Sequence, residues 1–148
     1  MTSVNRTKSK SSLFLMEMIV TLLFFSIASA ICVQLFAQAH ILSRQAKELN
    51  AAVAISQSFV EVMRGTDGSI DSIWTQFMDA DRISDHELSQ YYDSDFQICN
   101  KSDALYIADV TLTSTSAFQI IHVEFICLEN KSLVYELSAT KYINTPQG

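Results

Sequence analysis

Glycine and proline are scarce in this chain of 148 residues. Three glycines and one proline are present, and neither residue type occurs before Gly65. Because these residues are the strongest breakers of regular structure, we expect long uninterrupted elements and few tight turns. The scarcity also excludes a glycine-rich phosphate loop, and neither a Gly-x-Ser-x-Gly nor a Cys-x-x-Cys motif is present.

Positive charge is scarce in the second part of the chain. From His40 to the end there are seven Lys and Arg residues against fifteen Asp and Glu residues. A protein that binds nucleic acid through a broad surface needs clustered basic side chains. We therefore expect no direct nucleic-acid binding.

No group of residues carries an obvious chemistry. His40, His86 and His122 are scattered, and none has a Cys or His neighbour at metal-ligand spacing. The acidic run 79–87 lacks the central glycine and the terminal glutamate of a calcium loop, so a solvated loop is expected. We expect no enzymatic activity, no cofactor and no metal.

A long apolar run, 13–39, contains a single charge, Glu17. As a helix it would span about 40 Å, which exceeds the ~30 Å hydrocarbon core of a bilayer, so a transmembrane helix is expected. Three basic residues and no acid precede it, which predicts a cytoplasmic N-terminus and an exported acidic part. A secretory signal cut after Ala30 is the alternative, but Glu17 interrupts such a signal and apolar residues continue beyond Ala30.

Glu17 is the most informative residue of the run. A carboxylate at membrane depth needs a positive partner or a proton, and such a group is a functional-site hypothesis by default. The alternative is that Glu17 lies near the interface and extends its carboxylate into the head-group region.

The run Ser12-Leu13-Phe14-Leu15-Met16-Glu17-Met18-Ile19-Val20 resembles the N-terminal motif of type IV pilins and pseudopilins. The resemblance implies a basic leader, 1–12, removed by a prepilin peptidase between Ser12 and Leu13. Leu13 would then be the methylated N-terminus, with Glu17 as the fifth mature residue. Two positions depart from the family pattern, which usually has glycine in place of Ser12 and phenylalanine in place of Leu13.

The resemblance also implies a function. It predicts a structural subunit of a type IV pilus, a type II secretion pseudopilus or a competence pseudopilus, located in the bacterial cytoplasmic membrane. Its partners would be other pilin-like subunits and the filament assembly machinery, and Glu17 would pair with the N-terminal amine of a neighbouring subunit. The alternative is an unprocessed single-pass anchor that presents a small extracytoplasmic binding domain.

The helix is expected to continue over 40–65. Apolar residues recur there at spacings of three and four in one stripe: Leu42, Ala46, Leu49, Val53, Ser56, Val60 and Met63. A second strip lies beside it: Ala52, Ile55, Phe59 and Val62. Either one strip packs on the chain's own domain and the other on neighbouring helices, or both form one broad core face.

The remaining segment, 66–148, is expected to complete a globular domain. Residues 69–80 predict a short helix with Trp74 in the core, and Ser84 with Glu87 fits a capping box that opens a brief helical turn. Cys99 and Cys127 form a candidate disulfide if the segment is exported, and two buried free thiols are the alternative.

Alternating patterns then predict strands at 95–99, 104–113, 118–128 and 133–142, separated by short polar turns. One apolar face is expected to carry alternate residues of the last three strands: Tyr106, Ala108, Val110 and Leu112; Ile121, Val123, Phe125 and Cys127; and Leu133, Tyr135, Leu137 and Ala139. The expected fold class is α+β, with the long N-terminal helix packed on an antiparallel sheet of about four strands. The same arrangement is the architecture that the pilin resemblance implies.

Overall fold

The computed structural model describes the backbone of residues 5–143 and the side chains of residues 11–143. The chain forms two compact units, which meet between Gln45 and Ala46. The element order is α1 (Asn5–Gly65), α2 (Ile70–Gln76), β1 (Asp81–Arg82), β2 (Glu87–Tyr92), β3 (Tyr106–Ser114), β4 (Phe118–Cys127) and β5 (Ser132–Tyr142). The expected α+β class is confirmed, and the sheet has five strands.

Helix α1 ends at Gly65, the first glycine in the sequence. The Thr66 amide and hydroxyl both donate to the Val62 carbonyl, at 3.0 and 2.7 Å. The Lys141 ammonium group reaches in from β5 and donates to the carbonyls of Met63, at 3.1 Å, and Thr66. These donors satisfy carbonyls that have no partner in the next helical turn, and the positive charge suits the negative end of the helix dipole.

Gly68 is favoured in this turn by its backbone conformation. Its φ angle is +79°, a region that side-chain-bearing residues rarely adopt. A Cβ atom there would also lie 1.9 Å from Oε1 of Gln119, so the end of the Gln119 side chain would have to move.

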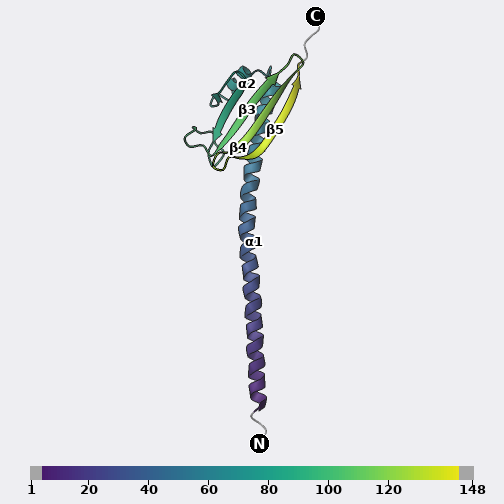
Figure 1. Ribbon diagram of the computed structural model, residues 1–148, viewed down its shortest axis with the longest axis vertical. Coiled ribbons are helices and arrows are strands. Elements are labelled where there is room, and N and C mark those ends of the chain that lie inside the picture. The colour runs from purple at the N-terminus through teal and green to yellow at the C-terminus, as the bar shows by residue number, and fades with distance from the viewer. Residues whose placement is uncertain (1–4, 144–148) are drawn as a thin grey trace. The chain divides into compact units, whose positions relative to one another are not determined.

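The sheet is an antiparallel meander in the order β1-β2-β3-β4-β5. Figure 1 shows β3, β4 and β5 side by side across the last turns of α1. The inner face carries the alternating residues that the sequence predicted on β3, and all four are buried: Tyr106, Ala108, Val110 and Leu112. On β4 the alternate residues Ile121, Val123 and Phe125 are fully buried as well.

The part of α1 that belongs to the second unit buries one face. Its buried residues are Ala52, Ser56, Phe59, Val60 and Met63, which pack with the inner face of the sheet and with α2. The Phe59 ring lies 4.1 Å from that of Phe77, measured between centroids. Both predicted strips contribute to this single face, whereas Leu42 and Leu49 at the start of the first strip are exposed.

Strand β2 was missed because its pattern does not alternate between polar and apolar residues. Gln90 lies on the core side opposite Ala108 and is 1% exposed, and it accepts a hydrogen bond from the Tyr92 hydroxyl at 2.8 Å.

The capping box predicted at Ser84 and Glu87 is wrong. Ser84 lies in the hairpin turn between β1 and β2, and Glu87 begins a strand.

Two other predictions need correction. The predicted strand 95–99 is reduced to a single bridge between Ile98 and Tyr92. A bulge between Phe125 and Ile126 makes Tyr135 pair with Phe125 and Leu133 with Ile126, so β5 holds one extra residue, Val134. Val134 consequently packs against the core and Leu133 is exposed, which reverses the predicted side for Leu133.

We predict that Phe59→Ala lowers the free energy of unfolding by about 3–5 kcal/mol, because it removes a fully buried ring and leaves a cavity. Denaturant titration of the full chain in detergent micelles, followed by Trp74 fluorescence, measures the change. The matched control is Gln57→Ala on the exposed side of the same helix, where a change within about 0.5 kcal/mol is expected. Equal effects of the two substitutions would contradict this packing.

Candidate functional site

The first unit contains a helix that is long and apolar enough to cross a membrane. It lies near the N-terminus, and its most apolar window has a mean hydropathy of 2.3. Every described side chain from Ser11 to Ile41 is exposed, including Leu13, Phe24 and Phe36. A long helix surface made mostly of exposed apolar side chains is suited to lipid and costly in water.

Hydroxyl groups within this segment are satisfied by the helix itself. Thr21 donates to the Glu17 carbonyl, Ser26 to that of Leu22 and Ser29 to that of Phe25, each at 2.8 Å. Such bonds to the carbonyl four residues earlier let polar side chains stay in an apolar environment without an unmet donor.

Glu17 differs from these hydroxyl-bearing residues. Within the side chains that the structure describes, 11–143, no hydrogen bond or ion pair is formed by its carboxylate. It lies on a shallow groove of the helix surface with Leu13, Met16, Val20 and Thr21. A carboxylate in apolar surroundings therefore needs either a proton or a positive group from outside the described side chains.

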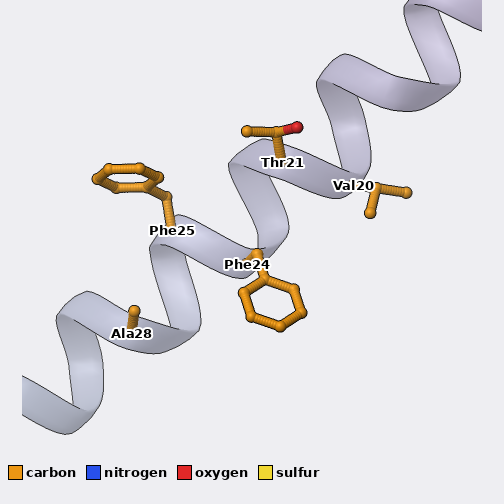
Figure 2. Close-up of a pocket in the computed structure, with 5 residues that line it drawn as sticks. All are labelled: Val20, Thr21, Phe24, Phe25 and Ala28. Carbon is orange, nitrogen blue, oxygen red and sulfur yellow. The ribbon is translucent and has the colours of Figure 1, made fainter.

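The apolar groove continues along the same helix. Val20, Thr21, Phe24, Phe25 and Ala28 line its next portion, and Figure 2 shows the Phe24 and Phe25 rings directed to different sides of the helix. Ala28 is small and lies one turn beyond Phe24. The Phe24 ring therefore projects from the helix surface, and the surface at Ala28 is lower. Surfaces of this kind allow helices to pack closely in lipid.

The predicted processing residues lie on the continuous helix. Ser12 and Leu13 are both within α1, and both are exposed. The predicted leader, 1–12, lies largely outside the described side chains, which start at Ser11. Cleavage between Ser12 and Leu13 therefore stays a prediction.

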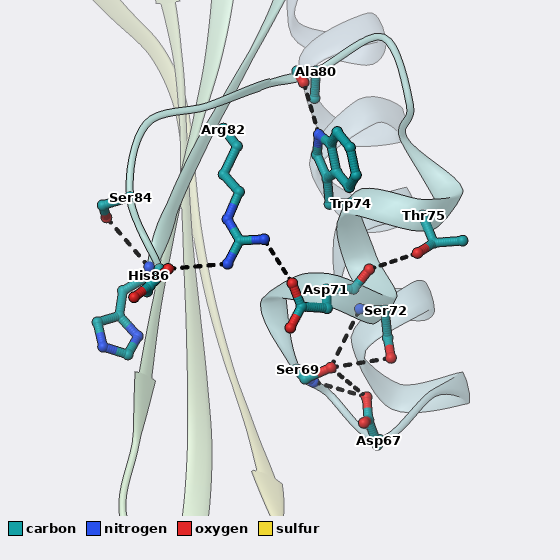
Figure 3. Close-up of polar contacts among 11 residues, drawn as sticks. Asp67, Ser69, Asp71, Ser72, Trp74, Thr75, Ala80, Arg82, Ser84 and His86 are labelled. Atoms are coloured by element: carbon teal, nitrogen blue, oxygen red, sulfur yellow. Dashed lines mark hydrogen bonds and ion pairs between the residues drawn. The ribbon is translucent and has the colours of Figure 1, made fainter.

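In the second unit, a polar network fixes α2 and the first hairpin (Figure 3). The Arg82 guanidinium group bonds to Asp71 of α2 at 2.6 Å and to Asp85 of the hairpin turn at 3.1 Å. The sequence of this acidic stretch predicts a solvated loop. Arg82, the single basic residue within it, is the signal that a local ion pair forms there.

The prediction that Trp74 lies in the core is wrong. Its indole N–H donates to the Ala80 carbonyl at 3.1 Å, but the side chain is 40% exposed rather than buried in the core. The core side of α2 is formed by Ile70 and Ile73, which are 7% and 0% exposed.

A carboxylate with a shifted pKa, that of Asp67, lies two residues before the N-cap of α2. Asp67 accepts hydrogen bonds from the Ser69 amide at 2.9 Å and hydroxyl at 2.8 Å, and that hydroxyl also caps the Ser72 amide. Hydrogen bonding by Ser72 and then Ser69 favours the charged form and lowers the pKa of Asp67 to about 2.

Cys99 and Cys127, the candidate disulfide pair, are free thiols in this structure, and both are half-buried. Ile98 pairs with Tyr92 of β2, whose other side pairs with β3, and β3 pairs with the strand of Cys127. Because strands lie about 4.8 Å apart, three spacings put Cys99 on the order of 14 Å from Cys127, beyond disulfide reach. Burial, together with Asp93 and Asp103, raises the pKa of the Cys99 thiol.

The histidines are not gathered into one site. His122 lies on the outer face of the sheet, where Nδ1 is 2.8 Å from the Ser138 hydroxyl and Nε2 is 3.6 and 3.7 Å from Glu124 and Glu136. Over the described side chains, no group of three His, Cys, Asp or Glu residues has an arrangement that could hold a metal ion. The contacts of His122 are therefore with polar side chains of β4 and β5, on the outer face of the sheet.

Comparisons with known proteins found no match to any protein-family model, any curated protein or any solved structure.

We predict that Asp67→Asn destabilises the protein at pH 7 and that its difference from the wild type shrinks at acid pH. A carboxylate whose pKa is lowered on folding stabilises the folded state above its unfolded pKa, near 3.8. That stabilisation is lost as the pH falls through the folded pKa of about 2. Denaturation midpoints measured from pH 7 to pH 2 test this, with the exposed Asp79→Asn as the control. A difference that does not change with pH would disprove the assignment.

Proposed function

We propose that this chain is a pilin-like structural subunit of a type IV filament system, assembled from the membrane after leader cleavage. The observation that carries the proposal is the position of Glu17. It is the only charge in the exposed apolar run 13–39, and it is the fifth residue after the expected cleavage point. The architecture supports the proposal, because the same helix continues into a domain where it covers an antiparallel sheet.

Cleavage between Ser12 and Leu13 would create the positive group that Glu17 lacks. The new α-amine of Leu13 would be protonated near neutral pH and would lie at the start of the shortened helix. Glu17 would then occupy the first turns of that helix, where a negative charge is favoured by the helix dipole. The axial offset between the two groups is about 6 Å, which is one helical turn.

Pairing between subunits follows from that offset. The Leu13 amine of one subunit, displaced along the membrane normal, would meet the Glu17 carboxylate of its neighbour. Both charges are costly to hold in hydrocarbon alone, so their pairing favours one axial register over the others. The apolar groove beside Glu17 supplies the surface along which the neighbouring helix packs.

The proposal includes a membrane orientation. The N-terminal flank contains Arg6, Lys8 and Lys10 and no acidic residue, which favours its retention on the cytoplasmic side. The acidic domain would then lie outside the cytoplasmic membrane, and on assembly it would be carried into a pilus, a secretion pseudopilus or a competence pseudopilus. Its acidic balance favours a scaffold that does not contact nucleic acid.

We predict that the mature protein begins at N-methylated Leu13 when it is produced with a prepilin peptidase. Mass spectrometry of the intact chain and of its N-terminal peptide measures this directly. Ser12→Gly supplies the usual family residue and should increase the processed fraction, and production without the peptidase is the control. A chain that retains Met1 identifies an unprocessed anchor, and a start at Ile31 identifies a secretory signal. Either result refutes the proposal.

We predict that Glu17→Val leaves membrane insertion intact and impairs filament assembly, because the partner amine loses its counter-ion. Membrane fractionation and the amount of subunit in sheared filaments measure the two properties. Thr21→Val, one turn further along the same groove, removes a polar group without removing a charge and should assemble normally. Normal incorporation of the Glu17→Val variant would show that the charge pair is not needed.

A further inference from the structure

The outer face of the sheet carries a row of acidic side chains. The strand register places Asp109 of β3, Glu124 of β4 and Glu136 of β5 directly opposite one another. Like charges on directly opposite residues destabilise a sheet. The positions of β1 to β5 on this face include no Lys or Arg residue. The row therefore lacks a permanent counter-charge from its own strands.

His122 lies between two of these carboxylates. Its Nε2 atom is 3.6 Å from Oε1 of Glu124 and 3.7 Å from Oε1 of Glu136. Its Nδ1 atom is 2.8 Å from the Ser138 hydroxyl, which can accept or donate a hydrogen bond. Ser138 can therefore hold the ring in place whether the imidazole is neutral or protonated. The His122 side chain is 35% exposed, so a proton can reach and leave the ring without unfolding of the sheet.

The remaining charged groups that face His122 from the neighbouring strands are acidic as well. On β3 the residue directly opposite is Thr111, and Asp109 lies in the next row of the same face. On β2, Glu87 lies opposite Thr111. The loop lysine Lys101 lies over an aromatic ring of β2, so β3 lies between this lysine and His122. Each nearby carboxylate favours a positive charge on the ring.

We propose that His122 makes the contact between β4 and the edge strand β5 dependent on pH. With a proton, the imidazolium ring attracts Glu124 and Glu136 together and offsets the repulsion between them. Without the proton, two carboxylates remain directly opposite each other with no cation at Nε2. Within residues 5–143, β4 is the only strand that pairs with β5, so these cross-strand contacts bear directly on how firmly β5 is held.

The contact also bears on the end of α1. Lys141 of β5 donates to the carbonyls of Met63 and Thr66, so an opening of β5 removes these bonds too. The proton on His122 therefore affects how firmly both the edge strand and the end of α1 are held. The proposal does not depend on the filament role, because it rests only on residues of the second unit.

The direction of the pH dependence follows from which protonation state is favoured. An imidazole in an unfolded chain titrates near pH 6.5. A folded state that favours the imidazolium gains stability below this pH and loses it as the pH rises beyond it. We therefore expect β5 to be held more firmly at mildly acid pH than at mildly alkaline pH.

Hydrogen exchange of β5 tests the proposal. The full-length wild type and the His122→Gln variant are compared in detergent micelles at about pH 5.5 and about pH 8, where ordinary carboxylates are charged. Mass spectrometry of a peptide that covers 132–142 gives the protection of the β5 amides. A comparison of two proteins at the same pH cancels the intrinsic effect of pH on exchange. The matched control is His86→Gln, because His86 is exposed in the first hairpin turn and lies between Asp85 and Glu87 in the sequence.

The ratio of wild-type to His122→Gln protection should be about 2- to 30-fold larger at the acid pH than at the alkaline pH, as expected for two partly exposed ion pairs. For His86→Gln the ratio should be the same at both pH values. An unchanged ratio for His122→Gln would leave this residue a merely structural role and would overturn the proposal. A pH effect of equal size for His86→Gln would attribute the change to general attraction between histidines and an acidic protein, which would overturn it too.

A double-mutant cycle measures one charge pair independently. His122→Gln and Glu136→Gln are made singly and together, and urea titration followed by Trp74 fluorescence gives the unfolding equilibrium constants. The coupling should be about 1.5- to 5-fold at the acid pH, and it should decrease at the alkaline pH and in about 1 M salt.

The control cycle pairs His122→Gln with Glu87→Gln. Glu87 lies on the same face of the sheet, two strands away on β2, so no coupling is expected. Coupling to Glu136 that does not change with pH, or that is matched by coupling to Glu87, would contradict the proposal.

Discussion

The fold depends on covering one face of an antiparallel sheet. Val110, Ile121, Val123 and Phe125 form an apolar inner face, and each such side chain contributes about 1.5–3 kcal/mol when it leaves water. The last turns of α1 supply the cover through Phe59 and Met63. The contacts that hold the end of α1 matter for the same reason, since Lys141 joins this end to the far strand.

The same helix begins with an apolar segment that is exposed among the described side chains, 11–143. From Leu13 to Phe36 its large side chains are exposed, and its hydroxyl groups are satisfied within the helix. Glu17 is the exception, because a carboxylate has no N–H or O–H with which to bond to helix carbonyls. A helix of this kind is suited to a membrane, where its one carboxylate needs a positive partner or a proton. The proposed filament function supplies that partner as the N-terminal amine of another subunit.

The two proposals concern carboxylates that lack a permanent counter-charge. In the first unit Glu17 is the only charge of an apolar run, and in the second unit Glu124 and Glu136 lie directly opposite each other on adjacent strands. Charge pairing in lipid selects an axial register between helices, because a lone charge is costly there. On the exposed face of the sheet, water and salt weaken such pairing, and a histidine makes it depend on pH. The medium around each carboxylate therefore decides whether its pairing directs assembly or adjusts the stability of one strand.

The sequence by itself determined the α+β class, the long helix and the three long strands. These follow from local periodicity and from the absence of glycine and proline before Gly65. It also determined that Glu17 is alone in an apolar segment. The tertiary structure decided three features that local sequence patterns cannot predict. Gln90 lies in the core, where its amide oxygen accepts a hydrogen bond from Tyr92. A bulge turns Leu133 outward, and two strands lie between Cys99 and Cys127. These features depend on which strands are neighbours, and strand neighbours are set by long-range pairing rather than by residue spacing.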